Sequence, residues 1–239
     1  GCNSLISIII PDSVTSIGDY AFDSCSQLIS ITIPDSVTSI DDSAFHGCIS
    51  IKVVTIPDGV TRIAGNVFGA CESLTSVTIG DSVKTIGNNV FGNCNKLNNF
   101  NGEPILIINN ELYTRAPAAT ITTYTVPNGV TSIGNNVFKE CKSLTSITIP
   151  DSVISIGDNA FNKCTSLASI SIGEGVKYIG NYAFTECYAL TSITLPDSVI
   201  SIGDYAFKHC TRMTTINIPD GIISIGDGVF AYCNITDFN

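Results

Sequence analysis

The residues with the greatest chemical potential in this 239-residue sequence are its cysteines, which can act as nucleophiles, metal ligands or disulfide partners. There are ten, and each lies 23 residues after the last, except for one gap of 47 residues between Cys94 and Cys141. Metal sites need local groups such as CxxC or a Cys/His cluster, and the sequence contains neither. A fixed spacing indicates instead that each cysteine occupies the same place in a structural repeat. The ten are Cys2, Cys25, Cys48, Cys71, Cys94, Cys141, Cys164, Cys187, Cys210 and Cys233.

Stacked repeats would place neighbouring cysteines about 5 Å apart, which is within the range of a disulfide. Their Cβ atoms would point in the same direction, however, and every cysteine would have two equivalent neighbours. A free cysteine is also a good small core residue. The pattern favours reduced thiols that line a core. Disulfides between some neighbours and a metal site are the alternatives.

Other reactive side chains are sparse. The two histidines, His46 and His209, lie in different repeats, and we expect both to be exposed to solvent. The sequence lacks the GxxxxGK[ST], GxSxG, HExxH and GxGxxG motifs, so we expect no enzymatic activity, no cofactor and no catalytic metal. A column of carboxylates is typical of turns, with calcium binding as the alternative. It comprises Asp12, Asp35, Asp58, Asp81, Asp151, Glu174, Asp197 and Asp220.

The overall charge narrows the choice of partner. The 21 acidic and 11 basic residues give a formal net charge of −10. This charge disfavours nucleic acids and anionic membranes, which bind basic patches. No apolar run is long enough to cross a membrane, so we expect no membrane insertion. The N-terminal residues lack the features of a signal peptide, and both ends fall within a repeat. We therefore expect a fragment of a longer protein, and a monomer.

The repeat reads C-x2-L-x2-I-x-I-P-D-S-V-x2-I-G-x2-A-F-x2-C. Its L-x-x-I-x-I part predicts a short strand with one buried face, which proline then ends. The next apolar pair predicts a second extended stretch. Asp19, Asn135, Asp158 and Asp204 are placed to cap a single helical turn that carries Ala-Phe. Tyr20, Tyr182 and Tyr205 fall beside these caps, where they are expected to cover the turn, with a contact role as the alternative.

One such repeat cannot bury its own apolar side, whereas stacked repeats can. Nine phenylalanines share one register: Phe22, Phe45, Phe68, Phe91, Phe138, Phe161, Phe184, Phe207 and Phe230. The sequence therefore predicts a single solenoid over residues 1–239 with about ten turns. At a strand spacing of about 4.8 Å, ten strands would extend roughly 45–50 Å.

One repeat departs from this pattern. Residues 95–118 form a 24-residue repeat if Ala118 takes the place of a missing cysteine. Within it, residues 105–113 have apolar runs on both sides of Asn109-Asn110, which predicts a hairpin-like segment. This segment is either a tolerated insertion or a binding protrusion, since loops on rigid scaffolds often carry function.

The L-x-x-I-x-I core and the AFxxC ending together resemble the BspA-like, or Treponema pallidum-type, leucine-rich repeat family. The resemblance covers nearly the whole chain. It implies an α/β leucine-rich repeat fold, a right-handed superhelix with a curved parallel sheet on its concave side. Extended segments and single-turn helices would form the convex side. The resemblance also implies a surface or secreted protein, because several members of the family are adhesins.

The candidate binding residues are the outward-facing positions of the predicted strands, nearly all of which carry hydroxyl groups. They are Ser30, Thr32, Ser76, Thr78, Ser146, Thr148, Ser169, Ser171, Ser192 and Thr194. The alternative is that these residues are only strand-compatible polar filler, because interface hot spots usually include Trp, Tyr or Arg.

The family resemblance and the repeated surface together suggest a non-enzymatic module at the cell surface or in secreted form. We expect an adhesin fragment that recognises a host-cell protein or extracellular matrix through many weak contacts. The alternatives are a structural stalk that displays another domain and a weak glycan-binding surface. The near absence of aromatic residues on the predicted sheet argues against glycans.

Overall fold

A computed structural model describes residues 1–238 as a succession of short β-strands, most of them paired in parallel, joined by turns. The described residues contain no helix, and hence none that could cross a membrane. The chain forms two compact units. Unit 1 comprises residues 1–108 and 116–119, and unit 2 comprises residues 109–115 and the described chain from Thr120 onward. Each unit shows the β-solenoid arrangement that the 23-residue spacing predicts, and one 23-residue repeat is called a coil below.

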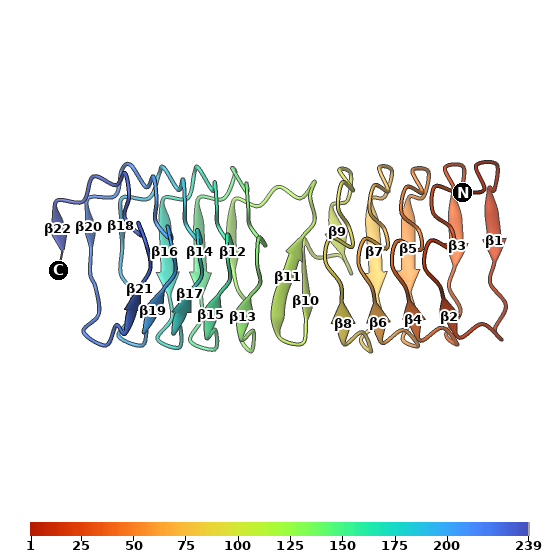
Figure 1. Cartoon of the computed structure of the whole chain (residues 1–239), viewed down its shortest axis with the longest axis horizontal. Helices are drawn as coiled ribbons and strands as arrows, with labels where there is room; N and C mark the ends of the chain where they lie inside the picture. The colour runs from red at the N-terminus through yellow and green to blue at the C-terminus, as the bar shows by residue number, and fades with distance from the viewer. Residues whose placement is uncertain (239) are drawn as a thin grey trace. The chain divides into compact units, whose positions relative to one another are not determined.

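In unit 1 every complete coil contributes one strand to each of two series (Figure 1). Strands in a series pair in parallel with residues that lie 23 positions further along the chain, such as Val54 with Val77. The first series contains β1 (Ser7–Ile9), β3 (Ser30–Thr32), β5 (Val53–Ile56), β7 (Ser76–Ile79) and β9 (Asn99–Phe100). The second contains β2 (Ser16–Ile17), β4 (Ser39–Ile40), β6 (Arg62–Ile63) and β8 (Thr85–Ile86), and β10 (Ile105–Ile108) follows.

Unit 2 has the same two series. The first contains β12 (Thr123–Thr125), β14 (Ser146–Ile149), β16 (Ser169–Ile172), β18 (Ser192–Ile193), β20 (Thr215–Ile216) and β22 (Asp237–Phe238). The second contains β11 (Glu111–Arg115), β13 (Ser132–Ile133), β15 (Ser155–Ile156), β17 (Tyr178–Ile179), β19 (Ser201–Ile202) and β21 (Ser224–Ile225). Ile147 pairs with Ile170, and Ile156 pairs with Ile179, so the 23-residue register holds in both series.

The core of each unit is built from equivalent side chains stacked on one another. Alternate residues of β5 and β14 are buried, as expected for strands with one inward face. In unit 2, Phe161 stacks on Phe138 and on Phe184 with ring centroids 5.1 Å apart in both pairs. Phe22 and Phe45 of unit 1 stack at 5.2 Å. The predicted phenylalanine register is thus confirmed within each unit.

The predicted single-turn helices are wrong. Each Ala-Phe segment instead forms consecutive turns, with left-handed residues such as Asn159 (φ 54°) and Lys163 (φ 61°) on either side of Phe161. A residue at positive φ interrupts a right-handed helix. The backbone N–H of Phe161 donates to the Ala183 carbonyl of the next coil at 2.8 Å. Alternate N–H groups of the segment therefore donate to the next coil, whereas those between them, such as that of Asn162 to the Asn159 carbonyl at 3.1 Å, close turns within the coil.

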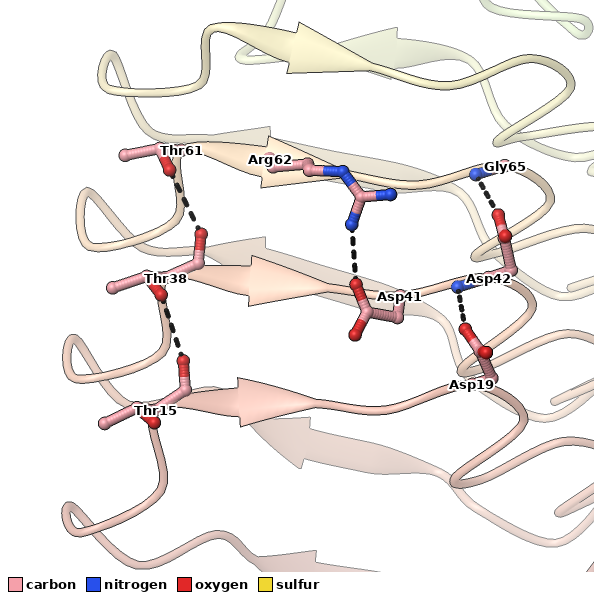
Figure 2. A network of polar contacts seen from close by, with 8 residues as sticks. All are labelled: Thr15, Asp19, Thr38, Asp41, Asp42, Thr61, Arg62 and Gly65. Atoms are coloured by element: carbon pink, nitrogen blue, oxygen red, sulfur yellow. Dashed lines mark hydrogen bonds and ion pairs between the residues drawn. The ribbon is translucent and has the colours of Figure 1, made fainter.

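The predicted helix caps consequently have another role. Asp19 Oδ1 accepts the N–H of Asp42 at 2.9 Å, and Asp42 Oδ1 accepts the N–H of Gly65 at 2.7 Å (Figure 2). In unit 2, Asn135 and Asp158 accept bonds from the next coil in the same way. Each side chain therefore satisfies a backbone donor exactly one repeat further along the chain. Threonine hydroxyls form a parallel ladder in Figure 2, and Arg62 Nη1 lies 2.6 Å from Asp41 Oδ1.

This ladder can be tested at Asp158, whose Oδ1 accepts the Asn181 N–H at 2.7 Å. Replacement by alanine removes the acceptor and should lower the free energy of unfolding by about 1 kcal/mol. Replacement by asparagine keeps a carbonyl oxygen and should change stability by less than about 0.5 kcal/mol. Urea denaturation of both variants measures the difference. Equal destabilisation by the two substitutions would contradict a ladder role.

The divergent repeat keeps part of its predicted form. Asn109 and Asn110 lie between β10 and β11 and have φ angles of 49° and 62°, as a type I′ hairpin turn requires. Ala118, however, is exposed, whereas Ala116 is fully buried. Ala118 therefore does not take the buried position of the missing cysteine.

Candidate binding surface

The predicted binding residues of unit 2 lie in register on neighbouring strands. Ser146 of β14 pairs with Ser169 of β16, and Thr148 pairs with Ser171. Thr148, Ser169 and Ser171 are exposed, and Ser146 is half-buried. The intervening Ile147 is buried, because alternate residues of a strand face opposite sides. The hydroxyl groups thus form two rows on a regular backbone.

The series continues through β18, where Ser192 is exposed and pairs with Thr215 of β20. Thr194 is also exposed but lies just after β18. We define the hydroxyl face as Ser146, Thr148, Ser169, Ser171, Ser192 and Thr194.

The predicted residues of unit 1 form a less uniform surface. Ser30 and Thr32 of β3 are exposed, but Thr32 pairs with Ile9, a large apolar residue that is 86% exposed. On β7, Ser76 pairs with Val53 on one side and donates to Asn99 Oδ1 at 2.8 Å on the other. Thr78 is exposed. The hydroxyl rows of unit 1 are therefore interrupted by apolar and amide side chains.

Within residues 1–238, the six hydroxyls of the hydroxyl face make no side-chain hydrogen bond. Neighbouring hydroxyls behave differently. Thr145 Oγ1 donates to the Thr122 carbonyl at 2.9 Å, and Ser152 Oγ donates to the Val130 carbonyl at 2.8 Å. These two hydrogen bonds connect a coil to the preceding coil. The hydroxyl groups of the hydroxyl face, in contrast, remain available as donors and acceptors for a partner.

An open surface pocket of about 510 Å³ lies where β14 and β16 end. Thr148 and Ser171 line it together with two carboxylates, Asp151 and Glu174. Asp151 Oδ1 accepts the N–H of Glu174, 23 residues further along the chain, at 2.9 Å, so this carboxylate bonds to the next coil and not to its own turn. In the sequence the hydroxyls and the carboxylates form separate columns. Asp151 follows Thr148 by three residues, and Glu174 follows Ser171 by three residues, and this constant offset is the signal that both columns share one pocket.

The same bond between coils recurs in unit 1, where Asp58 Oδ1 accepts the Asp81 N–H at 3.0 Å. The calcium alternative gains no support, since residues 1–238 contain no cluster of three or more His, Cys, Asp or Glu side chains suited to a metal ion.

The cysteines belong to the core and not to the surface. All ten are free, and eight are buried. Seven thiols donate to the carbonyl of the phenylalanine 26 residues earlier, as Cys164 does to Phe138 at 3.0 Å. Burial raises the pKa of the Cys48 and Cys164 thiols to about 12. The other donors are Cys48, Cys71, Cys94, Cys187, Cys210 and Cys233.

The histidines are less exposed than the sequence predicts, and they lie in different units. His46 Nδ1 is 3.1 Å from Asp23 Oδ1, and His209 stacks on Tyr232 at 4.5 Å. Both rings are half-buried. Within its repeat, each histidine follows the Ala-Phe segment, whereas the residues of the hydroxyl face belong to the strands of the first series or directly follow them.

Parallel coils of 23 residues, with inward Leu, Ile and Phe and an outward strand surface, define a leucine-rich repeat solenoid. A family model described as "BspA type Leucine rich repeat region (6 copies)" matches residues 1–119 and 107–236. The chain therefore belongs to the BspA-type leucine-rich repeat family. Leucine-rich repeat proteins generally act as protein-interaction modules.

Solved structures show the same fold. A leucine-rich repeat protein from Bacteroides ovatus is 29% identical, with a TM-score of 0.57, and the match covers 100% of this chain and 79% of the other. A leucine-rich cell surface protein from Faecalibacterium prausnitzii is 30% identical, with a TM-score of 0.62 and coverages of 99% and 80%. The pneumococcal vaccine antigen PcpA is 17% identical, with a TM-score of 0.65 and coverages of 98% and 67%. No functionally curated protein matches the chain.

Proposed function

We propose that this chain is a non-enzymatic binding module of a cell-surface or secreted protein, and that it acts as an adhesin for a host-cell or extracellular-matrix protein. The observation that carries the proposal is the hydroxyl face. Its six hydroxyls, five of them on exposed residues, have no hydrogen-bond partner in the described chain, and all but that of Thr194 lie on paired strands. Rigid strands reduce the entropy that binding side chains would lose.

The similarity to known proteins supports the same proposal. The F. prausnitzii relative, at 30% identity, is described as a leucine-rich cell surface protein. Repeated and individually weak contacts favour binding through avidity. The pocket beside Thr148 and Ser171 adds two carboxylates to the hydroxyl face, so that one partner can contact both kinds of group.

The proposal can be tested with lysine substitutions in one row of the hydroxyl face. The variant Thr148→Lys/Ser171→Lys/Thr194→Lys places three long charged side chains on three successive coils. We expect its binding to an immobilised extracellular-matrix preparation, and to cultured epithelial cells, to fall at least about tenfold, because a hydrogen-bonding surface would be blocked.

A matched control adds the same charge elsewhere in unit 2. Ile154→Lys/Ile200→Lys/Ile223→Lys introduces lysine at positions equivalent to the natural Lys177. This control should bind as the parent does, and circular dichroism should show that both variants fold. Equal binding by the parent and the hydroxyl-face variant would overturn the assignment of the surface.

A structural stalk is the second candidate, and the ladders between coils favour it. Side chains such as Asp158 and Ser152 join each coil to its neighbour by hydrogen bonds, which stiffens the stack. If the parent protein bound neither matrix nor cells in the same experiment, the adhesin proposal would fail and the stalk would be preferred.

A further inference from the structure

A cluster of aromatic side chains lies on the turns of unit 2, apart from the hydroxyl face. Tyr182 and Tyr205 stack with ring centroids 5.2 Å apart. Lys208 Nζ lies 5.0 Å from the Tyr205 ring centroid and 5.9 Å from that of Tyr232. Tyr232 in turn stacks on His209. We call these five residues the tyrosine cluster.

The backbone at these positions does not favour tyrosine. Tyr182 and Tyr205 have φ angles of 56° and 55°, in the left-handed region that a bulky residue rarely adopts. Asparagine tolerates this conformation far better. Equivalent positions of other coils carry Tyr20, Ser43, Asn66, Asn89, Asn136 and Asn159. Tyr182 and Tyr205 thus stand against the local backbone preference, and they differ from Tyr20 because their rings stack on each other, which points to a role for the paired side chains.

The next coil provides room for the ring. Gly228 occupies the equivalent position after Tyr205, and a Cβ atom there would lie 2.5 Å from Tyr205 Cε1. Any larger residue at 228 would displace the tyrosine ring. The arrangement of Tyr182, Tyr205 and Gly228 thus depends on three successive coils.

The arrangement of the rings selects a class of partner. One face of Tyr205 is occupied by Tyr182, and its ring also contacts Lys208 and Gly228. A sugar that stacks on tyrosine needs an open ring face, so Tyr205 is poorly suited to a glycan. The cluster is nevertheless accessible from solvent, with Tyr182 38% and Tyr232 69% exposed. Protein interfaces use tyrosine in this way, because it offers a large contact area with little loss of side-chain entropy.

The charges beside the cluster define the partner further. Asp204 and Asp227 are exposed and directly precede Tyr205 and Gly228. Asp204 Oδ1 accepts the Asp227 N–H at 2.8 Å, and its second oxygen has no protein partner in the described chain. These two carboxylates outnumber Lys208, the one lysine of the cluster, and the chain carries a net charge of −10. Arginine complements such a surface, because its guanidinium pairs with carboxylates and contacts aromatic rings.

We infer that the tyrosine cluster is a second interaction surface, which binds a protein segment that presents arginine beside an apolar or aromatic side chain. This surface is separate from the hydroxyl face and does not depend on the function proposed for it.

A peptide library provides the test. A phage-displayed library of random 12-residue peptides is first depleted on the variant Tyr182→Asn/Tyr205→Asn and then selected on the parent protein. The selected peptides should contain arginine together with aromatic or aliphatic residues. They should bind the parent at least about tenfold more tightly than the depletion variant, as expected when an interface hot spot is lost.

Two control variants of the chain test whether peptide binding is specific to the tyrosine cluster. Tyr20→Asn changes the equivalent tyrosine of unit 1, which is 63% exposed and stacks on no other ring in the described chain, and it should leave peptide binding unchanged. Thr148→Lys/Ser171→Lys/Thr194→Lys should also bind the peptides normally, which separates this inference from the proposed adhesin surface. Asparagine suits the left-handed backbone, so the depletion variant should keep its thermal midpoint.

A third variant addresses the charge. Asp204→Asn/Asp227→Asn keeps the amide oxygen that joins the two coils but removes both negative charges. Peptide affinity should fall severalfold and lose part of its dependence on salt concentration. Selection of acidic peptides, of peptides that bind the depletion variant equally well, or of no peptides at all would overturn the inference.

Discussion

Replacement of Phe161 by alanine is expected to lower the free energy of unfolding of unit 2 by about 3–5 kcal/mol. Phe161 is fully buried and stacks on Phe138 and Phe184 at 5.1 Å. The substitution removes two aromatic contacts and leaves a cavity that stacked coils cannot fill, because the backbone is fixed by hydrogen bonds on both sides. Urea denaturation followed by circular dichroism measures the change.

Phe22 provides the comparison. It is half-buried and stacks on one phenylalanine, Phe45. Phe22→Ala should therefore cost roughly half as much as Phe161→Ala. If the two substitutions destabilised their units equally, stacking on both sides would not be the source of the effect.

The second large effect concerns thiol reactivity. At pH 8 we expect only Cys2, which is exposed, and Cys233, which is half-buried, to react rapidly with a thiol reagent in the folded protein. The other eight cysteines are buried. Because burial raises the pKa of Cys48 and Cys164 to about 12, only about one thiol in 10⁴ at these positions is ionised at pH 8, and the thiolate is the reactive form. Titration with a chromogenic disulfide reagent counts the reactive thiols.

The denatured protein is the control for that count. Without reductant it should yield ten thiols, and a clearly smaller number would show that disulfides link neighbouring coils.

The raised pKa values of Cys48 and Cys164 also predict how the stability of the folded protein changes with pH. In the unfolded chain a cysteine ionises near pH 8.5, so the stability that these thiols contribute is intact below about pH 8.5. It is lost progressively as the pH rises toward the folded value of about 12.

The repeat architecture could be predicted from the sequence because one register is marked by several residue types at once. Phe161, Cys164 and Leu167 each recur with the same spacing, and each is fully buried as predicted. The turns could not be predicted in the same way. The Ala-Phe segment resembles a capped helical turn, but Asn159 and Lys163 adopt left-handed φ angles, and alternate N–H groups of the segment donate to the next coil.

The bonds from cysteine thiols to phenylalanine carbonyls were also missed, because their spacing differs from the period of the repeat. The Cys164 thiol bonds to the carbonyl of Phe138, which is 26 residues away, since the partner lies one coil and three residues earlier. For the hydroxyl face, alternation along each strand was enough to predict that Thr148 and Ser171 are exposed. Their shared pocket with Asp151 and Glu174 depends on how the strand ends turn, which alternation does not describe.

The bond from Asp158 to the backbone of Asn181 joins equivalent positions of adjacent coils, as do the strand pairs. A duplication or deletion of 23 residues, made between equivalent positions, therefore keeps the strand pairs in register at the new junction. Such a bond re-forms there wherever the acceptor side chain is present, whereas a change of 22 or 24 residues would place each donor opposite the wrong acceptor. Unequal recombination within the coding sequence can thus alter the number of coils while it preserves the register of the strand pairs. Array length is consequently free to evolve separately from the chemistry of the surface.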